Sequence, residues 1–275
     1  MGNNILHMLK NHLHNIKLTI GFLNEVADKG SYDALAEYLA YMCSPYFILD
    51  YVKNGLFSRD LRSSIKIQNK FGKFEVGRNW WGVYMVSEQV EPESEPFFNL
   101  RKGAVFVDAG SNVGKYSINM ALKGNKTIAF EPNPDIFKLF KCNIIKNGCV
   151  KKINAHELAL SSKNGRSVLY LNKVHVGHSS MDEKTETPVT IRTATLDSFN
   201  LAPDLIKIDV EGHEYEVLQG AHRTIAKYHP RIILEILDTN SQSASRIDDF
   251  LCKMGYKCIA SNLDGLNYVY DYGNP

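Results

Sequence analysis

Residues 105 to 114, Val-Phe-Val-Asp-Ala-Gly-Ser-Asn-Val-Gly, constrain the fold of this chain more than any other stretch. A short apolar run ends in an acid, and two glycines four residues apart follow. This order predicts a β-strand that enters a ligand-binding loop, because glycine lets the backbone turn tightly and approach a ligand. We therefore expect a strand over 104–108, and a close approach of a ligand at Gly110 and Gly114.

The spacing of this loop, Asp-x-Gly-x-x-x-Gly, differs from the Gly-x-Gly-x-x-Gly that sets a pyrophosphate on a helix N-terminus in dinucleotide-binding folds. Asp108 stands at the strand tip and faces the loop. A carboxylate there would repel a phosphate but suits a cationic ligand. S-adenosylmethionine carries an ammonium and a sulfonium and no phosphate, so the loop favours this cofactor over a dinucleotide.

A second acid follows at the tip of the next predicted strand. Residues 126 to 131, Lys-Thr-Ile-Ala-Phe-Glu, predict that strand, and Glu131 lies 21 residues after Gly110. An acid about 20 residues beyond a glycine loop is placed to accept both ribose hydroxyls of an adenosine. Dinucleotides share this feature, so it does not separate the two cofactor classes. The alternative is a solvated turn residue or a helix cap.

Composition sets the outer limits. The chain has 275 residues, 44% hydrophobic and 23% charged, which is typical of a globular protein, and its net charge of +2 says little about partners. The five cysteines form no Cys-x-x-Cys pair, which argues against a disulfide framework or a zinc ribbon. No apolar run approaches the ~20 residues of a membrane span. We expect a cytoplasmic protein, and leave peripheral membrane contact and the oligomeric state open.

From residue 104 onward, predicted strands and helices alternate, which indicates an α/β fold with a doubly wound, mostly parallel sheet. The expected strands are 104–108, 126–131, 150–155, 205–209, 231–236, 256–260 and 267–271. The expected helices are 114–123, 134–147, 213–228 and 243–254. Between residues 164 and 195, two alternating stretches around a His/Gly/Ser-rich loop at 174–181 predict a β insertion over the ligand-binding edge.

The first hundred residues differ in character. Residues 1 to about 57 predict a few short helices with breaks at glycines and a proline, and residues 64–78 predict a hairpin. Residues 53–78 hold seven basic and two acidic side chains, which indicates either a solvated face or a site for phosphate-bearing partners. We expect two domains: an N-terminal helical segment with a hairpin over 1–95, with a role in substrate or oligomer contacts, and a catalytic domain over 96–275.

Three polar residues follow the strand predicted at 205–209. Asp209, Glu211 and His213 stand at alternate positions, with Gly212 between the last two. Ligands of doubly wound sheets bind outside the carboxyl ends of the strands, so these groups should border the reactive end of the cofactor. Acids and an imidazole held together can tune one another's pKa, as a base that removes a hydroxyl proton requires. The sequence does not decide which of them is the base.

Two alternatives remain for this stretch. Glu211 could cap the following helix while His213 lies on the surface. Carboxylate and imidazole groups also suit Mn, Fe or Zn, although we expect no metal here.

Several motifs of the chain, in order and spacing, resemble the FkbM family of S-adenosylmethionine-dependent methyltransferases. The resemblance covers about residues 97 to 237. Its motifs are Asp108-Ala-Gly-Ser-Asn-Val-Gly114, Tyr116-Ser117, Phe130-Glu-Pro-Asn-Pro134, Ala159-Leu-Ser161 with Gly165, Thr195-Leu-Asp197, Ile206-Lys-Ile-Asp-Val-Glu-Gly-His-Glu214, Val217-Leu-x-Gly-Ala221, and Pro230 with Glu235.

The resemblance implies a class I methyltransferase (Rossmann-like) sheet of seven strands, the last antiparallel. It also implies S-adenosylmethionine as cofactor, held by residues that match the family's motifs. The methionine part would contact Asp108, Gly110, Asn112 and Gly114; the ribose would contact Glu131, with Pro132 beside it; the adenine would lie beside Leu158 and Ala159. Ser111 stands where the family more often has alanine.

The activity implied by the resemblance is O-methylation of a hydroxyl on a sugar, glycolipid or related metabolite. Glu235, at the tip of the fifth strand, is a candidate to hold a neighbouring hydroxyl. A partner other than a small molecule or glycan is not expected, but methylation of RNA ribose 2′-hydroxyls stays an alternative because of the basic 53–78 stretch. A non-catalytic nucleotide-binding protein of the same fold is another. An NAD-dependent oxidoreductase is disfavoured by the missing glycine triplet.

Overall fold

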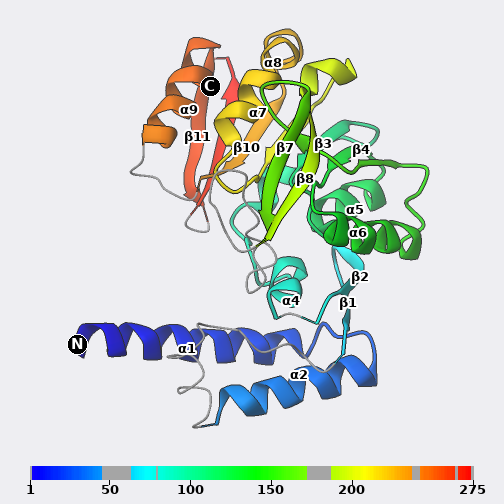
Figure 1. The fold of residues 1–275 in the computed structure, drawn as a ribbon, viewed down its shortest axis with the longest axis vertical. Coiled ribbons are helices and arrows are strands. Elements are labelled where there is room, and N and C mark those ends of the chain that lie inside the picture. The colour runs from blue at the N-terminus through cyan, green and yellow to red at the C-terminus, as the bar shows by residue number, and fades with distance from the viewer. Residues whose placement is uncertain are drawn as a thin grey trace. The chain divides into compact units, whose positions relative to one another are not determined.

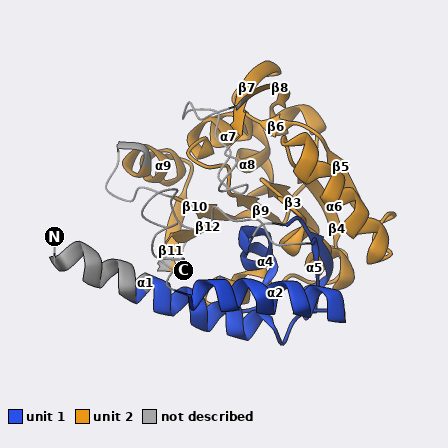
Figure 2. Cartoon of the chain, turned by 60° about the horizontal axis from the view of Figure 1, so that its bottom comes forward, with its two compact units in different colours: residues 1–90 blue, residues 91–275 orange. Residues whose placement is uncertain are grey.

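The structure is a computed structural model, and it describes residues 2–44, 63–78, 80–171, 187–236, 242–263 and 266–273. The chain forms two compact units, residues 1–90 and residues 91–275, which are coloured separately in Figure 2. The basic stretch at 53–62 and the loop at 174–181 lie outside the described residues.

Unit 1 contains helices and the predicted hairpin. Its elements are α1 (Gly2–Phe22), α2 (Lys29–Met42), β1 (Ile65–Asn69), β2 (Gly72–Val76) and α4 (Trp80–Val86). The sequence predicted short helices with breaks at glycines and a proline, and α1 ends at Phe22, one residue after Gly21. Gly21 also serves packing, because a Cβ there would lie 2.1 Å from Nε2 of Gln89. Because it stands in the last turn, its low helix propensity costs little.

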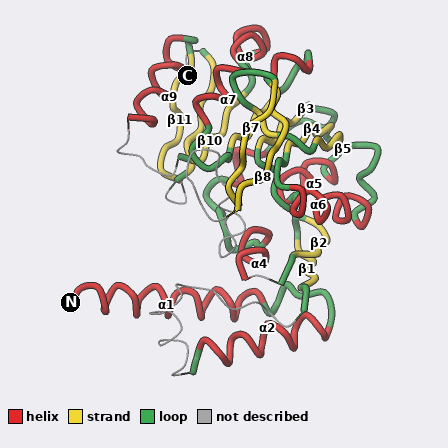
Figure 3. Tube along the Cα trace, viewed as in Figure 1, coloured by secondary structure: helices red, strands yellow, loops and turns green. Residues whose placement is uncertain are grey.

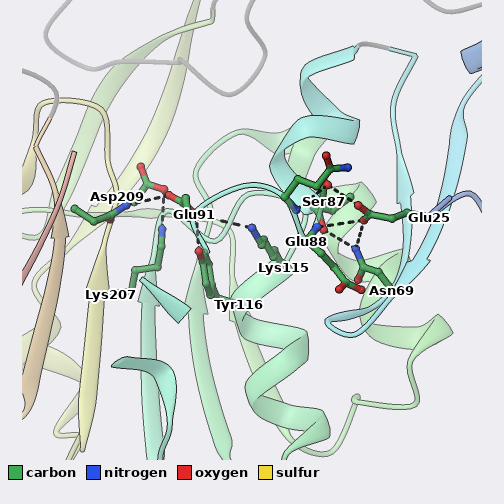
Figure 4. A network of polar contacts seen from close by, with 12 residues as sticks. Glu25, Asn69, Ser87, Glu88, Glu91, Lys115, Tyr116, Lys207 and Asp209 are labelled. Atoms are coloured by element: carbon green, nitrogen blue, oxygen red, sulfur yellow. Dashed lines mark hydrogen bonds and ion pairs between the residues drawn. The ribbon is translucent and has the colours of Figure 1, made fainter. Parts of the chain in front are cut away.

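One half-buried acid connects the parts of unit 1. The Glu25 carboxylate accepts hydrogen bonds from Asn69 Nδ2 at 2.7 Å, Ser87 Oγ at 2.6 Å and the Glu88 backbone N–H at 3.2 Å (Figure 4). It therefore fixes the connection after α1 to the end of β1 and to the end of α4. In the hairpin, Lys66 pairs with Asp28 at 2.8 Å, so this basic side chain already has an acidic partner.

Unit 2 contains a seven-stranded sheet in the order β11-β12-β10-β9-β3-β4-β5 (Figure 1). The strands are β3 (Val105–Ala109), β4 (Lys126–Phe130), β5 (Ile153–His156), β9 (Leu205–Ile208), β10 (Arg231–Glu235), β11 (Tyr256–Leu263) and β12 (Asn267–Tyr272). The first five pair in parallel with one another, and β12 runs antiparallel to both of its neighbours. The seven predicted strands are thus confirmed, with ends shifted by up to a few residues.

Helices cover both faces of this sheet, as the trace in Figure 3 shows. They are α5 (Lys115–Leu122), α6 (Pro134–Lys146), α7 (Glu214–Gly220), α8 (His222–Tyr228) and α9 (Gln242–Lys253). Side chains alternate along each strand. Val107 therefore packs among residues of α7, α8 and α9, whereas Phe106 packs with Tyr116 and Met120 of α5. We call the second side the α5 face of the sheet.

One predicted helix, 213–228, is two helices in the structure. α7 ends at Gly220 and α8 begins after Ala221, whose φ of −107° and ψ of 2° depart from helical values. Gly220 lies against another segment, because a Cβ there would be 2.0 Å from the Ser161 carbonyl oxygen. The helical pattern of the sequence shows neither the break nor this contact.

The predicted β insertion forms a separate three-stranded sheet. It consists of β6 (Ala159–Leu160), β7 (Gly165–Leu171) and β8 (Thr187–Ala194), in the order β6-β8-β7. Its position over a ligand stays a prediction. Two short 3-10 helices, η1 (Glu95–Phe98) and η2 (Leu196–Phe199), were not predicted, because a single turn leaves little periodicity in a sequence.

Gly110 provides a test of how tightly the loop after β3 packs against the residues after β9. A Cβ at this position would lie 1.7 Å from the Asp209 carbonyl oxygen, whereas at Gly103, with nearly the same φ, it would meet nothing within 4 Å. We expect Gly103→Ala to cost about 1–2 kcal/mol for its left-handed backbone. Gly110→Ala should cost about 1–3 kcal/mol more for the collision. Urea unfolding of both variants measures the difference, and equal losses would show that the loop moves aside freely.

Candidate active site

Acids stand at the carboxyl ends of four parallel strands of unit 2. They are Asp108 in β3, Glu131 after β4, Asp209 after β9 and Glu235 at the end of β10. The carboxyl ends of parallel strands meet at one edge of a sheet, and ligands of doubly wound folds bind there. This edge is therefore the candidate active site.

Asp108 is buried, with 1% of its surface exposed, and its carboxylate is only half satisfied. Ser117 Oγ donates a 2.5 Å hydrogen bond to Oδ2, while Oδ1 has no hydrogen-bond partner among the described residues. Burial raises the pKa of Asp108, although Lys207, opposite it on β9, acts against that rise. A buried oxygen without a partner costs about 1–3 kcal/mol, so it points to a hydrogen-bond donor that a ligand would bring.

The glycines of the loop fulfil a need within the protein itself. A Cβ at Gly114 would lie 2.4 Å from the Phe140 ring, and at Gly110 the collision is with the Asp209 carbonyl. The packing of the protein therefore requires both glycines, and the close approach of a ligand to them stays a prediction. The loop also folds back on β4, since the N–H groups of Gly110 and Ser111 both donate to the Phe130 carbonyl at 3.0 Å.

Glu131 is buried and accepts two backbone hydrogen bonds, from Asn112 N–H at 2.9 Å and Asn133 N–H at 2.8 Å. Burial nevertheless raises its pKa to about 7. The alternative of a solvated turn or helix cap is wrong, because Asn133 caps α6 by accepting from Asp135 N–H. Pro132 stands half-buried between these residues. Glu131 thus joins the glycine loop to the start of α6.

The residues predicted beside an adenine are apolar and buried. Leu158 and Ala159 are 8% and 7% exposed, and they lie where β5 passes into β6. The Leu158 N–H donates to the His156 carbonyl at 3.1 Å, which makes a tight turn after β5. Their contact with a cofactor stays a prediction.

Asp209 belongs to a cluster of charges on the α5 face. Lys207 Nζ lies 2.7 Å from Asp209 Oδ2 (Figure 4). The Glu235 carboxyl is a neighbour of Asp209 on the next strand, and the charge of Asp209 raises its pKa. Burial would lower the pKa of Lys207, but the carboxylates of Asp209 and Asp108 outweigh it and raise that pKa. Lys207 is therefore a permanent buried cation among acids.

Glu91 is a member of this cluster that the sequence analysis did not identify. Its carboxylate accepts hydrogen bonds from the Tyr116 hydroxyl and, at 3.3 Å, from Asn267 Nδ2, and Lys115 Nζ lies 3.9 Å away (Figure 4). Its φ of 59° is unusual for a non-glycine residue. In the sequence it is one acid in a run of four, and no motif marks it.

Glu211 and His213 have surroundings different from those of Asp209. Glu211 and Gly212, with φ of 56° and 99°, turn the chain sharply after β9. His213 Nε2 then lies 3.0 Å from Ser161 Oγ, and its Nδ1 lies 3.7 Å from Glu216 Oε2. The structure thus places Asp209 with the acids of the α5 face, and His213 beside the segment that follows β6.

The described part of the chain also bears on metal binding and on membrane-spanning helices. Its His, Cys, Asp and Glu residues form no group of three or more that could hold a metal ion. Its helices include none with the length and apolar character needed to cross a membrane.

Seven strands in this order, with an antiparallel β12 and acids at the tips of β3 and β4, define the class I methyltransferase fold. Comparison with known proteins narrows the class. Residues 108–258 match the model of the Methyltransferase FkbM domain, so the chain belongs to the FkbM methyltransferase family.

The chain is similar to Hexuronic acid methyltransferase AglP of Haloferax volcanii, with 34% identity over 122 residues, 42% of this chain and 49% of that protein. It thus spans about half the length of that relative. Methyltransferase 1 of Beauveria bassiana is 27% identical over 168 residues, 50% of this chain and 67% of that protein. The crystal structure of Methyltransferase FkbM from Methylobacillus flagellatus has the same fold, with a TM-score of 0.50 and 15% identity over 96% of this chain and 60% of that chain.

Burial of Glu214 makes the free energy of unfolding depend on pH. It is buried, its Oε1 accepts from Gly212 N–H at 2.9 Å, and burial raises its pKa to about 7 from 4.5. The folded protein therefore holds this proton more tightly than the unfolded chain, and the free energy of unfolding falls as pH rises from 4.5 to 7. The loss is ~3 kcal/mol. Glu214→Gln should remove this loss.

The measurement is urea unfolding of the ligand-free protein at pH 5 and at pH 7.5. Glu216→Gln, a change on the same helix at a third-exposed side chain, is the control. If the free energy of unfolding of Glu214→Gln falls between pH 5 and pH 7.5 as much as that of the unchanged protein, Glu214 is not the group that releases a proton over this range.

Proposed function

We propose that this methyltransferase uses S-adenosylmethionine to methylate a hydroxyl group of a sugar, glycolipid or related metabolite. The observation that carries the proposal is the pair of buried acids at neighbouring strand tips, Asp108 with an unpartnered oxygen and Glu131. We also keep the division into an N-terminal segment, 1–95, and a catalytic domain, 96–275, as part of the proposal.

The residues present fit this cofactor. The unpartnered oxygen of Asp108 suits a cationic donor, and the buried carboxylate of Glu131 suits a pair of ribose hydroxyls. Gly110, Asn112 and Gly114 form the loop between these two acids. Pro132 would flank the ribose, and Leu158 with Ala159 would provide an apolar surface for an adenine. A dinucleotide would bring phosphates to the carboxylate of Asp108, so NAD fits less well.

The acceptor class rests on chemistry and on one relative. AglP is named as a hexuronic acid methyltransferase, and a sugar acceptor presents several hydroxyls. Carboxylates are strong acceptors of hydroxyl hydrogen bonds. On the α5 face, Asp209, Glu235 and Glu91 gather at the strand ends, which supports a hydroxyl-rich acceptor.

When bound, S-adenosylmethionine supplies an electrophilic methyl group with a neutral leaving group. The protein has to hold the acceptor oxygen in line with that methyl group, which contributes up to roughly 7–11 kcal/mol in model reactions. A hydroxyl is hardly ionised at neutral pH, so a base must take its proton as the new bond forms. A base contributes about 10²- to 10⁴-fold in rate.

We assign the role of base to Asp209. Its side chain is 14% exposed at the sheet edge and belongs to the same face as the unpartnered oxygen of Asp108. Glu211 and His213 stay within the proposed catalytic group as positioning residues. The hydrogen bond between His213 and Ser161 connects the turn that carries Asp209 to the segment that begins with Leu158 and Ala159.

Binding of the cofactor is tested by calorimetric titration. Asp108→Ala and Glu131→Ala should each weaken S-adenosylmethionine binding by about 1–3 kcal/mol, because each loses a charge-assisted hydrogen bond. NAD, titrated in parallel, should not bind. Unchanged affinity in both folded variants, or binding of NAD in place of S-adenosylmethionine, would contradict the cofactor assignment.

Chemistry is tested with an acceptor identified by screening hexuronic acids, glycans and lipid-linked sugars for methylation. Asp209→Asn should lower kcat by about 10²-fold or more at saturating cofactor. His213→Ala should keep its affinity for S-adenosylmethionine and lose turnover through misplacement of the turn. Full turnover in Asp209→Asn would move the base elsewhere, and methylation of RNA but of none of the sugars would replace the proposed acceptor class.

A further inference from the structure

Asp209 and Glu235 lie side by side at the ends of adjacent strands. In the parallel pairing of β9 and β10, Ile208 stands opposite Leu234, so the next residues of the two strands are neighbours. Two residues earlier along each strand, Lys207 and Ile233 occupy the same face. The two carboxyls therefore project from the α5 face of the sheet.

The two carboxyls are neighbours at the ends of adjacent strands. Two carboxylates side by side in buried surroundings repel each other, whereas a proton on one of them lets it donate a hydrogen bond to the other. The pair therefore favours one shared proton. Lys207 Nζ, 2.7 Å from Asp209 Oδ2, stabilises the charge on Asp209. The proton then belongs to Glu235.

The surroundings agree with this distribution of charge. The carboxylate of Asp209, then burial, then Glu91 raise the pKa of Glu235 well above its ordinary value, and Lys207 opposes them in part. The other charged and titratable groups of the cluster are Asp108 on β3 and Lys115 and Tyr116 on α5. Burial and Glu91 raise the pKa of Tyr116, so it stays a neutral donor to Glu91.

We propose that Glu235 is a proton-bearing positioning residue that donates its hydrogen bond to Asp209 and thereby aims the free lone pairs of Asp209 at the acceptor hydroxyl. The inference rests on the proposed function, since it concerns the base of that reaction. The acceptor oxygen forms its bond to the methyl carbon, and the sulfur–methyl bond breaks with its electron pair left on sulfur. The hydroxyl proton passes to Asp209, and Glu235 keeps its own.

The shared proton is tested first on the ligand-free protein, by infrared spectroscopy at pH 7. The carbonyl band of a protonated carboxylic acid should be present and should lose intensity in Glu235→Gln. It should also lose intensity in Asp209→Asn, because Lys207 then pairs with Glu235 and draws off its proton. Glu214→Gln removes another acid, whose pKa of about 7 leaves it half protonated at this pH, so its loss of intensity calibrates half a carboxyl.

Kinetics with the screened acceptor tests the role. Glu235→Ala should lower kcat by about tenfold or more, and Glu235→Gln should restore most of that loss, because the glutamine amide also donates to Asp209. The turnover of the unchanged enzyme should fall on the alkaline side as Glu235 loses its proton, and that fall should be absent in Glu235→Gln. Calorimetry should show the same S-adenosylmethionine affinity in both variants.

The outcomes separate the two proposals. If the intensity of the protonated-acid band is unchanged in both Glu235→Gln and Asp209→Asn, the shared proton is overturned, whatever the protein methylates. If Glu235→Gln is as inactive as Asp209→Asn, Glu235 is itself the base and the positioning role is wrong. If the protein binds no S-adenosylmethionine, the function fails, while the infrared result still decides whether the pair shares a proton.

Discussion

The buried ammonium of Lys207 is the interaction on which the arrangement of the site depends. It lies in the middle of the sheet, with 5% of its side chain exposed, opposite Asp108 on one neighbouring strand and 2.7 Å from Asp209. Isolated buried charges are costly, and several acids at one sheet edge would repel one another. A permanent cation on the central strand lowers both costs, so the acids of β3, β9 and β10 can converge at one edge of the sheet.

The sequence predicted the seven strands of the sheet and the acids at the ends of β3 and β4, but it did not predict how the residues after β9 are arranged. The seven strands have strong apolar patterns, and two glycines follow β3 at a distinctive spacing, so β3, β4 and their acids could be found locally. The alternation of Asp209, Glu211 and His213 suggested one cluster, but two successive left-handed residues, Glu211 and Gly212, send the chain to Ser161 instead. That turn depends on tertiary contacts, which a period-two pattern does not contain.

What the sequence could not show are pairings between distant segments. Glu91 stands 176 residues from Asn267 and meets it through packing of the whole unit. Gly220 looks like an ordinary helix residue until the Ser161 carbonyl is placed against it. In each case a residue's local propensity is a weak guide, because a partner far along the chain decides its role.

The position of Glu91 has a consequence for how such enzymes diversify. The family match begins at residue 108, yet this acid, 17 residues earlier, holds Tyr116 of α5 and Asn267 of β12. A recombination event that joined a new leading segment to the matched domain would therefore exchange one side of the proposed acceptor site along with it. New acceptors could be reached in this way without any change to the proposed cofactor loop.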